Sequence, residues 1–309
     1  MGNRALAAPA GLASPATVGM RVRTAGRVLV SRRARLALFT VGLALLFWEG
    51  GKLLFGVPWR ADGALIWNPP FRIPFFNDIN LPHIWAVLGG FFQPWQRGKE
   101  LLLWEYLAGA ALFTWREAGL GFLFGSAIGL VLATVFVHSR LLERAFVPYV
   151  IASQTIPIIA LAPLIISAFG QSMGSVVLIA TYLVFFPVTI AMIRGLRSFD
   201  PRALELMRSY ASPRRAIYWK LRLPASLPYF FTSLKIAATA SIVGAIIGEA
   251  PGGIQNGLGR VIVTFSNYYA TGPEKLWCAV IASALLGLVF YGLIALVEAR
   301  TLRGRGPAG

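Results

Sequence analysis

Residues 119–137 read GLGFLFGSAIGLVLATVFV, an uninterrupted stretch without a charge or a proline. An α-helix needs about 20 apolar residues to cross the hydrocarbon core of a membrane. Gly121, Gly125 and Gly129 lie four residues apart and share one helix face, and small residues at this spacing let two membrane helices approach closely. The stretch therefore predicts a membrane helix that packs against another helix.

Further apolar runs of similar length predict five more spans. Of all residues, 57% are hydrophobic and 13% are charged, with a mean hydropathy of +0.67. A soluble domain usually carries about 25% charged residues. The sequence therefore predicts an all-α, polytopic membrane helix bundle of about six transmembrane helices. Besides Gly119–Val137, the spans are expected at about Leu36–Phe55, Phe146–Phe169, Val176–Ile193, Tyr229–Ile247 and Trp277–Val297.

The charges predict the orientation of this bundle. Of the 29 basic residues, 20 fall in segments 1–35, 138–145, 194–222 and 300–309, whereas segment 57–114 has four basic and four acidic residues. Basic loops stay in the cytosol, so both termini are expected there, with the chain in the plasma or inner membrane. A net charge of +17 is also typical of nucleic-acid binders. Long apolar runs separate these charges, however, and no nucleic-acid partner is expected.

The same patterns suggest how the chain is divided. Residues 1–35 are basic and lack periodic hydrophobic residues, which predicts a disordered cytosolic tail. The transmembrane domain is expected at 36–300, with a cytosolic loop at 198–224, and a second cytosolic tail at 301–309. Cys278 is the single cysteine, and His83 and His138 stand in separate loops, so no metal site is expected. The chain contains no G-x-x-x-x-G-K-[ST] phosphate loop, and no cofactor is expected in it.

The cytosolic loop between the fourth and fifth spans has a distinctive sequence, since residues 200–224 read DPRALELMRSYASPRRAIYWKLRLP. Asp200 can cap a helix whose first residue is Pro201, and Ser212-Pro213 predicts the start of a second short helix that ends at Leu223. The result is a basic helix–turn–helix. One interpretation is an amphipathic hairpin that lies on the anionic inner leaflet of the membrane.

The spacing within this loop resembles the cytosolic signature of ABC importer permeases. That pattern is Glu-Ala-Ala, three residues, Gly, nine residues, then Ile-x-Leu-Pro. This chain has Glu205, then Ala211 at the glycine position, then nine residues before Leu221-Arg222-Leu223-Pro224. Leu206 and Met207 replace the two alanines. Glycine at position 211 would permit a positive φ, which alanine disfavours.

Four other motifs, in a region of about Leu81–Arg300, strengthen the resemblance. The first motif lies at the start of the second span and the second motif lies within the third span. The third motif lies at the start of the fifth span, and the fourth motif follows that span. The branch most similar to this chain contains permeases for nitrate, sulfonate, taurine, thiamine precursors or riboflavin. In order, the motifs are Thr114–Phe122, Ile156-Pro157 with Ala160–Leu164, Leu223–Pro228 with Leu234–Ala237, and Gly257-Leu258-Gly259.

The resemblance implies a type I importer fold and a mechanism. The permease would pair as a homodimer, dock on separate cytosolic ABC ATPase subunits that bind ATP, and receive a small organic or anionic solute from an extracytoplasmic binding protein. Glu205 would make a polar contact with the ATPase, or, alternatively, a surface ion pair with Arg202 or Arg208. Apolar side chains would form the rest of the contact, and Pro224 would end the loop and fix where the next span begins. The implied coupling residues are Glu205, Leu206, Met207, Arg208, Ala211 and Pro224.

Polar residues within the spans are candidates for the translocation pathway. Ser153, Gln154 and Thr155 precede Pro157 in the third span, where irregular backbone is tolerated if it faces protein or a water-filled cavity. Glu249 ends the fifth span and either lines the cavity or is a carboxylate solvated at the interface. Lys235, in the same span, is a functional candidate or snorkels to the cytosolic interface.

Two other classes of protein compete with this interpretation. An intramembrane enzyme needs a nucleophile–base pair or metal ligands at membrane depth, yet none of the predicted spans contains a histidine. A secondary transporter is expected to show internal repeats with broken helices in both halves, yet only one predicted span is broken. The sequence therefore favours a transport permease without enzymatic activity of its own.

Overall fold

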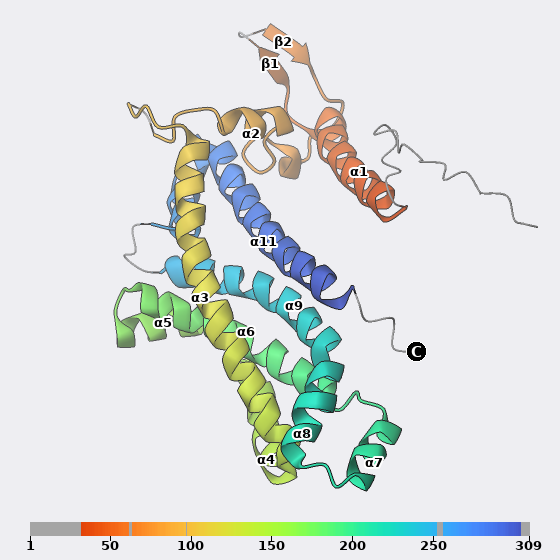
Figure 1. The fold of residues 1–309 in the computed structure, drawn as a ribbon. Coiled ribbons are helices and arrows are strands. Elements are labelled where there is room, and N and C mark those ends of the chain that lie inside the picture. The colour runs from red at the N-terminus through yellow and green to blue at the C-terminus, as the bar shows by residue number, and fades with distance from the viewer. Residues whose placement is uncertain (1–31, 62–63, 97, 252–255, 304–309) are drawn as a thin grey trace, which may run out of the picture. The chain divides into compact units, whose positions relative to one another are not determined.

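The computed structural model of the protein describes residues 32–61, 64–96, 98–251 and 256–303 (Figure 1). Five helices in these ranges are long and apolar enough to cross a membrane, and a bent helix pair would make a sixth span. The predicted all-α bundle is thus confirmed. Most of the predicted tail, residues 1–31, lies outside the described residues. The chain divides into two compact units, Met1–Gly50 and Gly51–Gly309, which are described separately.

The described part of the first unit is most of α1 (Arg32–Phe55). Large apolar side chains on this helix are exposed on every side, among them Leu38, Phe39, Leu46 and Phe47. A helix that is apolar all round is stable when lipid or protein surrounds it. α1 therefore has the surface of a membrane span, as the sequence predicts.

Three long helices form the centre of the second unit: α3 (Leu103–His138), α6 (Met173–Gly195) and α9 (Leu223–Glu249). The predicted glycine stripe of α3 faces α6. A Cβ atom on Gly125 would lie 2.6 Å from Cβ of Val184, and one on Gly129 would lie 2.8 Å from the carbonyl oxygen of Phe185. Only glycine allows these two helices to pack this closely, as expected for small residues in membrane helices.

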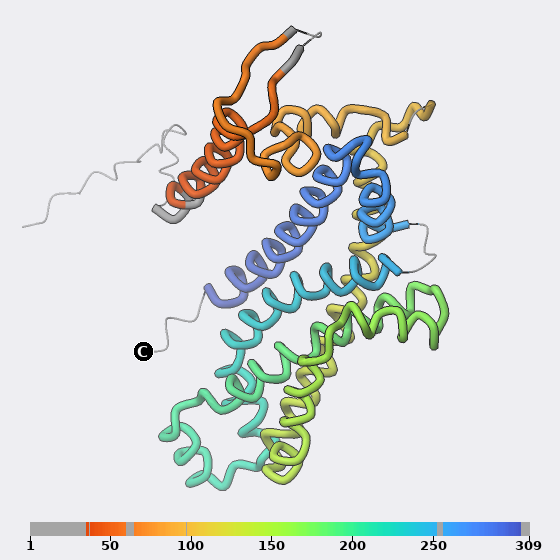
Figure 2. The backbone as a smooth tube through the Cα atoms, turned by 180° about the vertical axis from the view of Figure 1, so that it is seen from behind, coloured from red at the N-terminus to blue at the C-terminus, as the bar shows by residue number. Residues whose placement is uncertain are grey.

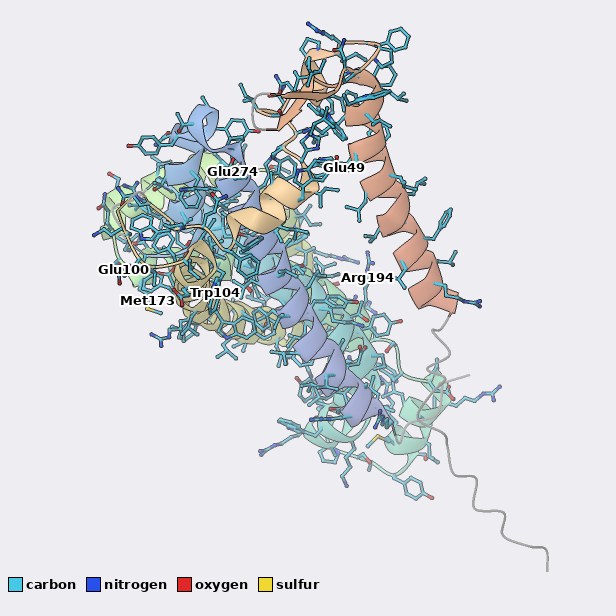
Figure 3. The ribbon with its side chains drawn as sticks, turned by 90° about the horizontal axis from the view of Figure 1, so that it is seen from above. Glu49, Glu100, Trp104, Met173, Arg194 and Glu274 are labelled. Carbon is cyan, nitrogen blue, oxygen red and sulfur yellow. The ribbon has the colours of Figure 1, made fainter. Side chains whose placement is uncertain are left out.

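A second cluster of buried apolar residues surrounds the first turns of α3. Leu103 and Leu107 of α3 pack with Val87 of α2 (Ile84–Gly90), Val261 of α10 (Leu258–Asn267) and Ala279 of α11 (Pro273–Leu302). Seen from above, the outside of the helices carries mostly carbon-rich side chains (Figure 3). The remaining short elements are β1 (Trp59–Ala61) and β2 (Ala64–Trp67), which form a hairpin, η1 (Pro74–Phe76) and η3 (Tyr269–Thr271).

An ion pair between a buried lysine and a half-exposed aspartate lies in the segment that follows α1. The side chain of Lys52 is fully buried, and its Nζ donates to Oδ1 of Asp78 at 2.6 Å and to the carbonyl oxygen of Leu81 at 2.7 Å. A buried ammonium group is tolerated when it is paired and hydrogen-bonded in this way. Lys52 therefore anchors residues 78–81 to the last turn of α1.

The structure corrects two of the predicted spans. α3 begins at Leu103 and not at Gly119, because the packing of Leu103 and Leu107 extends the helix through a stretch that contains charges. The third predicted span is two helices, α4 (Arg140–Ser153) and α5 (Ile158–Phe169), bent by 96°. The break falls at Pro157, whose missing N–H interrupts the helical hydrogen bonds.

Candidate functional sites: the α7 loop and the Glu249 clasp

The loop between α6 and α9 begins with the capped helix that the sequence predicts. Oδ1 of Asp200 accepts the backbone N–H of Arg202 at 2.9 Å, and Pro201 opens α7 (Pro201–Ser209). α7 contains no buried residue. It lies at the same end of the second unit as the turn between α3 and α4, as the view from behind confirms (Figure 2).

Ala211 adopts the backbone conformation that glycine normally supplies. Its φ is +52°, and it is the sole non-glycine residue with positive φ among the described residues. The N–H of Ala211 donates to the carbonyl oxygen of Arg208 at 2.9 Å, and that of Ser212 donates to Met207 at 3.0 Å. These two bonds define a Schellman motif, the usual glycine-dependent helix ending. The turn therefore has the geometry that glycine usually supplies, with an alanine in the strained position.

The second half of the loop differs from the prediction. Pro213, and not Ser212, is the N-cap residue, because its extended backbone places the first helical residue at Arg214. α8 (Arg214–Ile217) then runs through a π-helical turn, η2 (Tyr218–Arg222), into α9. Pro224 therefore does not end a helix. Its nitrogen cannot donate to the preceding turn, and such a gap is commonly accommodated by a wider turn.

The residues predicted to couple form an exposed surface. Glu205, Arg208 and Ala211 are exposed, Met207 is half-buried, and Leu206 is 59% exposed. None of the described residues forms an ion pair with Glu205, so the predicted alternative pairing with Arg202 or Arg208 is absent from this part of the chain. Tyr210 is 77% exposed beside Leu206 on this surface and was not among the predicted site residues. Its position as an aromatic residue directly before the turn is the sequence signal that could have identified it.

The predicted pathway residues at the broken span are mostly engaged with their own helix. The hydroxyl groups of Ser153 and Thr155 donate to the carbonyl oxygens of Val150 and Ala152, at 2.8 and 2.7 Å. The hydroxyl of Tyr182 donates to the carbonyl oxygen of Ser153. The side-chain nitrogen of Gln154 is buried without an acceptor among the described residues. Gln154 is thus the residue of the three that retains an unused donor.

Glu249 is fully buried at the end of α9, so it is not a carboxylate solvated at an interface. Its Oε1 accepts the hydroxyl of Thr114 at 2.7 Å, and its Oε2 accepts the N–H of Gly259 at 2.6 Å. The N–H of Leu258 in turn donates to Oγ1 of Thr114 at 2.9 Å. We call these four residues the Glu249 clasp. It ties α3 and α9 to the N-terminus of α10, where the helix dipole favours a negative charge.

A second carboxyl group adjoins the clasp. Glu117 lies beside Glu249, is fully buried, and has no donor for either oxygen among the described residues. Burying a carboxyl group without a hydrogen-bond partner costs free energy. Sequence reasoning missed Thr114 and Glu117 as partners of Glu249, because they stand 135 and 132 positions from it in the chain. Among the described residues, no hydrogen bond of Ser153, Thr155 or Glu249 joins the broken span to the Glu249 clasp.

Lys235 forms an ion pair with Glu298. Its Nζ lies 2.7 Å from Oε2 of Glu298, and about a fifth of each side chain is exposed. The ion pair joins α9 to α11 within two apolar helices. A carboxylate within reach therefore neutralises the ammonium group where it stands, and the snorkelling of Lys235 stays a prediction.

The comparisons with known proteins agree with this bundle of apolar helices and its exposed loop. Residues 125–303 match the family described as binding-protein-dependent transport system inner membrane component. The formylaminopyrimidine transport permease protein ThiX of Halalkalibacterium halodurans is 33% identical over 58% of this chain and 70% of its own length. The riboflavin transport system permease protein RibX of Chloroflexus aurantiacus is 31% identical over 85% of this chain and 88% of its own length.

A solved structure supports the fold. The crystal structure of an amino acid ABC transporter with histidines gives a TM-score of 0.52 at 17% identity, and the match covers 63% of this chain and 93% of that one. The chain belongs to the binding-protein-dependent transport system inner membrane component family. It is therefore a multi-pass membrane protein and the permease subunit of an ABC importer, and not an enzyme. The predicted family and its branch are confirmed.

Proposed function

We propose that this permease pairs with a second copy to form the translocation pathway for a small organic solute, and that α7 couples it to a separate ABC ATPase. An extracytoplasmic binding protein would deliver the solute. Relatives that carry the names of formylaminopyrimidine and riboflavin permeases support an organic solute. In this proposal ATP binds to the ATPase, both permease termini are cytosolic, and no cofactor binds to this chain.

The surface of α7 supports this proposal most directly. The helix exposes Leu206 and Tyr210 next to the carboxylate of Glu205 and the guanidinium group of Arg208. An exposed apolar patch with a polar rim marks a protein–protein contact. The Schellman turn at Ala211 fixes the end of this helix and keeps the patch in one orientation.

Glu205→Lys tests the docking role of α7. If Glu205 pairs with a basic group of the ATPase, reversing its charge removes an interfacial ion pair and weakens complex formation on the order of 30-fold. The affinity of the purified permease for the ATPase encoded with it is measured together with ATP-driven uptake of formylaminopyrimidine and riboflavin into proteoliposomes. Glu100→Lys, an exposed residue outside the loop, makes the same charge change and is expected to preserve the affinity.

Three outcomes would contradict the proposal. Unchanged affinity in Glu205→Lys would exclude the docking role of this residue. Uptake without any ATPase would exclude the coupling mechanism as a whole. A single permease copy in each functional complex, measured by mass in nanodiscs, would exclude the homodimer.

A further inference from the structure

A surface cavity of about 720 Å³ lies beside the α7 loop, where four segments of the second unit meet. The end of α3 contributes Val137, and α4 contributes Val147 and Pro148. The segment between α6 and α7 contributes Phe199, and these four residues give the cavity an apolar wall. The rest of the lining is charged, with Arg140, Arg144, Arg197, Arg222 and Glu143.

The charges of this cavity do not balance. Glu143 is the single acid in its lining, against four arginines. Arg197 occupies both oxygens of that acid, at 2.8 and 2.6 Å. Within the described part of the chain no carboxylate lies in ion-pair distance of Arg140, Arg144 or Arg222. Three of the four guanidinium groups therefore have no ion-pair partner among the described residues.

The arginines are placed so that one anion could contact several of them. The guanidinium group of Arg222 is half-buried and stacks 5.0 Å above the ring of Phe199, which restricts its position. Arg140 and Arg144 lie one turn apart on α4, so both project from the same side of the helix. The planar, multiply donating guanidinium group is the preferred protein ligand for phosphate oxygens.

The depth of the cavity indicates where such an anion comes from. Residues 118–137 of α3 are uncharged, and 20 helical residues span about 30 Å, the thickness of the hydrocarbon core. The cavity begins at the end of this run, at Val137, which places it at the level of the lipid headgroups. With the orientation proposed above, this is the inner leaflet, which contains anionic lipids.

We propose that this cavity binds a phosphate group, and that the phosphate belongs to an anionic phospholipid of the inner leaflet. The headgroup phosphate contacts the arginines while the start of an acyl chain lies on the wall formed by Val147 and Phe199. Arg140 and Arg144 lie on α4 and Arg222 follows the α7 loop, so a bound phosphate connects α4 to the end of the loop. The proposal rests on the proposed orientation but not on transport activity.

The test uses the full-length permease without its ATPase. The wild type and Arg140→Gln/Arg144→Gln are purified in a neutral detergent with phosphatidylglycerol, and retained lipid is counted by native mass spectrometry. Because each arginine near a headgroup contributes about fivefold to affinity, the double variant is expected to bind the lipid about 25-fold more weakly. Arg300→Gln/Arg303→Gln removes two charges from the end of α11, outside the cavity, and is expected to retain the lipid.

Glu143→Gln distinguishes anion binding from a loss of folding. This substitution removes the competing carboxylate and releases Arg197, so lipid affinity is expected to rise about fivefold. Inorganic phosphate and glycerol phosphate, titrated in lipid-free detergent, form the second arm. Tight binding of these ions without an acyl chain assigns the site to a free phosphate and overturns the lipid source. Equal lipid retention in all variants overturns the site itself.

Discussion

Ala211 stands at the glycine position of the permease signature, and its backbone has the left-handed conformation that glycine favours. The residue has a φ of +52°, a conformation that costs an L-amino acid about 1 kcal/mol relative to glycine. Both Schellman hydrogen bonds are nevertheless formed. The loop therefore stores strain at the end of the helix proposed to couple, and the family's glycine would remove it.

The substitution Ala211→Gly is expected to stabilise the end of α7. A relief of about 1 kcal/mol raises protection of its backbone amides about fivefold, because opening becomes that much less favourable. Amide hydrogen exchange across residues 207–212 of the detergent-solubilised permease measures this effect. Ala203→Gly serves as the control, since it places glycine in the helix interior and should reduce protection by a similar factor. A loss of protection in Ala211→Gly as well would argue against the left-handed conformation.

At the scale of single residues, local features were predictable and distant partners were not. The cap at Asp200 depends on neighbouring residues, and the sequence predicted it correctly. The environment of Glu249 depends on Thr114 and Gly259, which tertiary packing brings to it. Neither predicted role of Glu249 included hydrogen bonds to these two residues. The ion-pair partner of Lys235 was not predictable for the same reason, because Glu298 is 63 residues away in the chain.

At the scale of elements, hydropathy predicted where helices cross a membrane but not where they end. The apolar core of α3 was found, yet its first turns contain Glu105 and are held by packing against α10 and α11, which no hydropathy pattern reveals. The joining of α8 to α9 was missed because Pro224 looks like a helix boundary, whereas a π-helical turn carries the helix through it. Proline at position 157, by contrast, does break its helix.

The packing of α3 on α6 can be tested by adding a single methyl group. Gly125→Ala would bring a Cβ to 2.6 Å from that of Val184, so the helices must separate, and overpacking of this kind costs about 1–3 kcal/mol. Gly119→Ala, on the same helix, meets nothing within 4 Å and should be neutral or stabilising by up to about 1 kcal/mol. Thermal unfolding of the two variants in one detergent measures the difference. Equal midpoints would mean that the glycine stripe does not face α6 closely.

For the whole molecule, the central question is whether the bent pair α4–α5 crosses the membrane. The basic residues Arg140 and Arg144 follow α3, and the basic segment 194–222 begins at the end of α6. The positive-inside rule places both on the cytosolic side. α6 crosses once, so Ser172 at its start lies on the opposite side. The chain must therefore cross between Arg144 and Ser172, which makes α4 and α5 together one span despite the 96° bend.

Six crossings place both termini on the cytosolic side, whereas five crossings would separate the termini. Single cysteines are placed at Asn3, Ser172 and Ala308 in a Cys278→Ser background and probed in intact cells with a membrane-impermeant maleimide. Cys278 is buried, so its replacement by serine changes no exposed surface. Labelling is expected at position 172 and, only after the cells are opened, at positions 3 and 308. Labelling of one terminus in intact cells would show that α4 and α5 enter and leave the membrane on the same side. The positive-inside rule would then not explain the basic residues of segment 138–145.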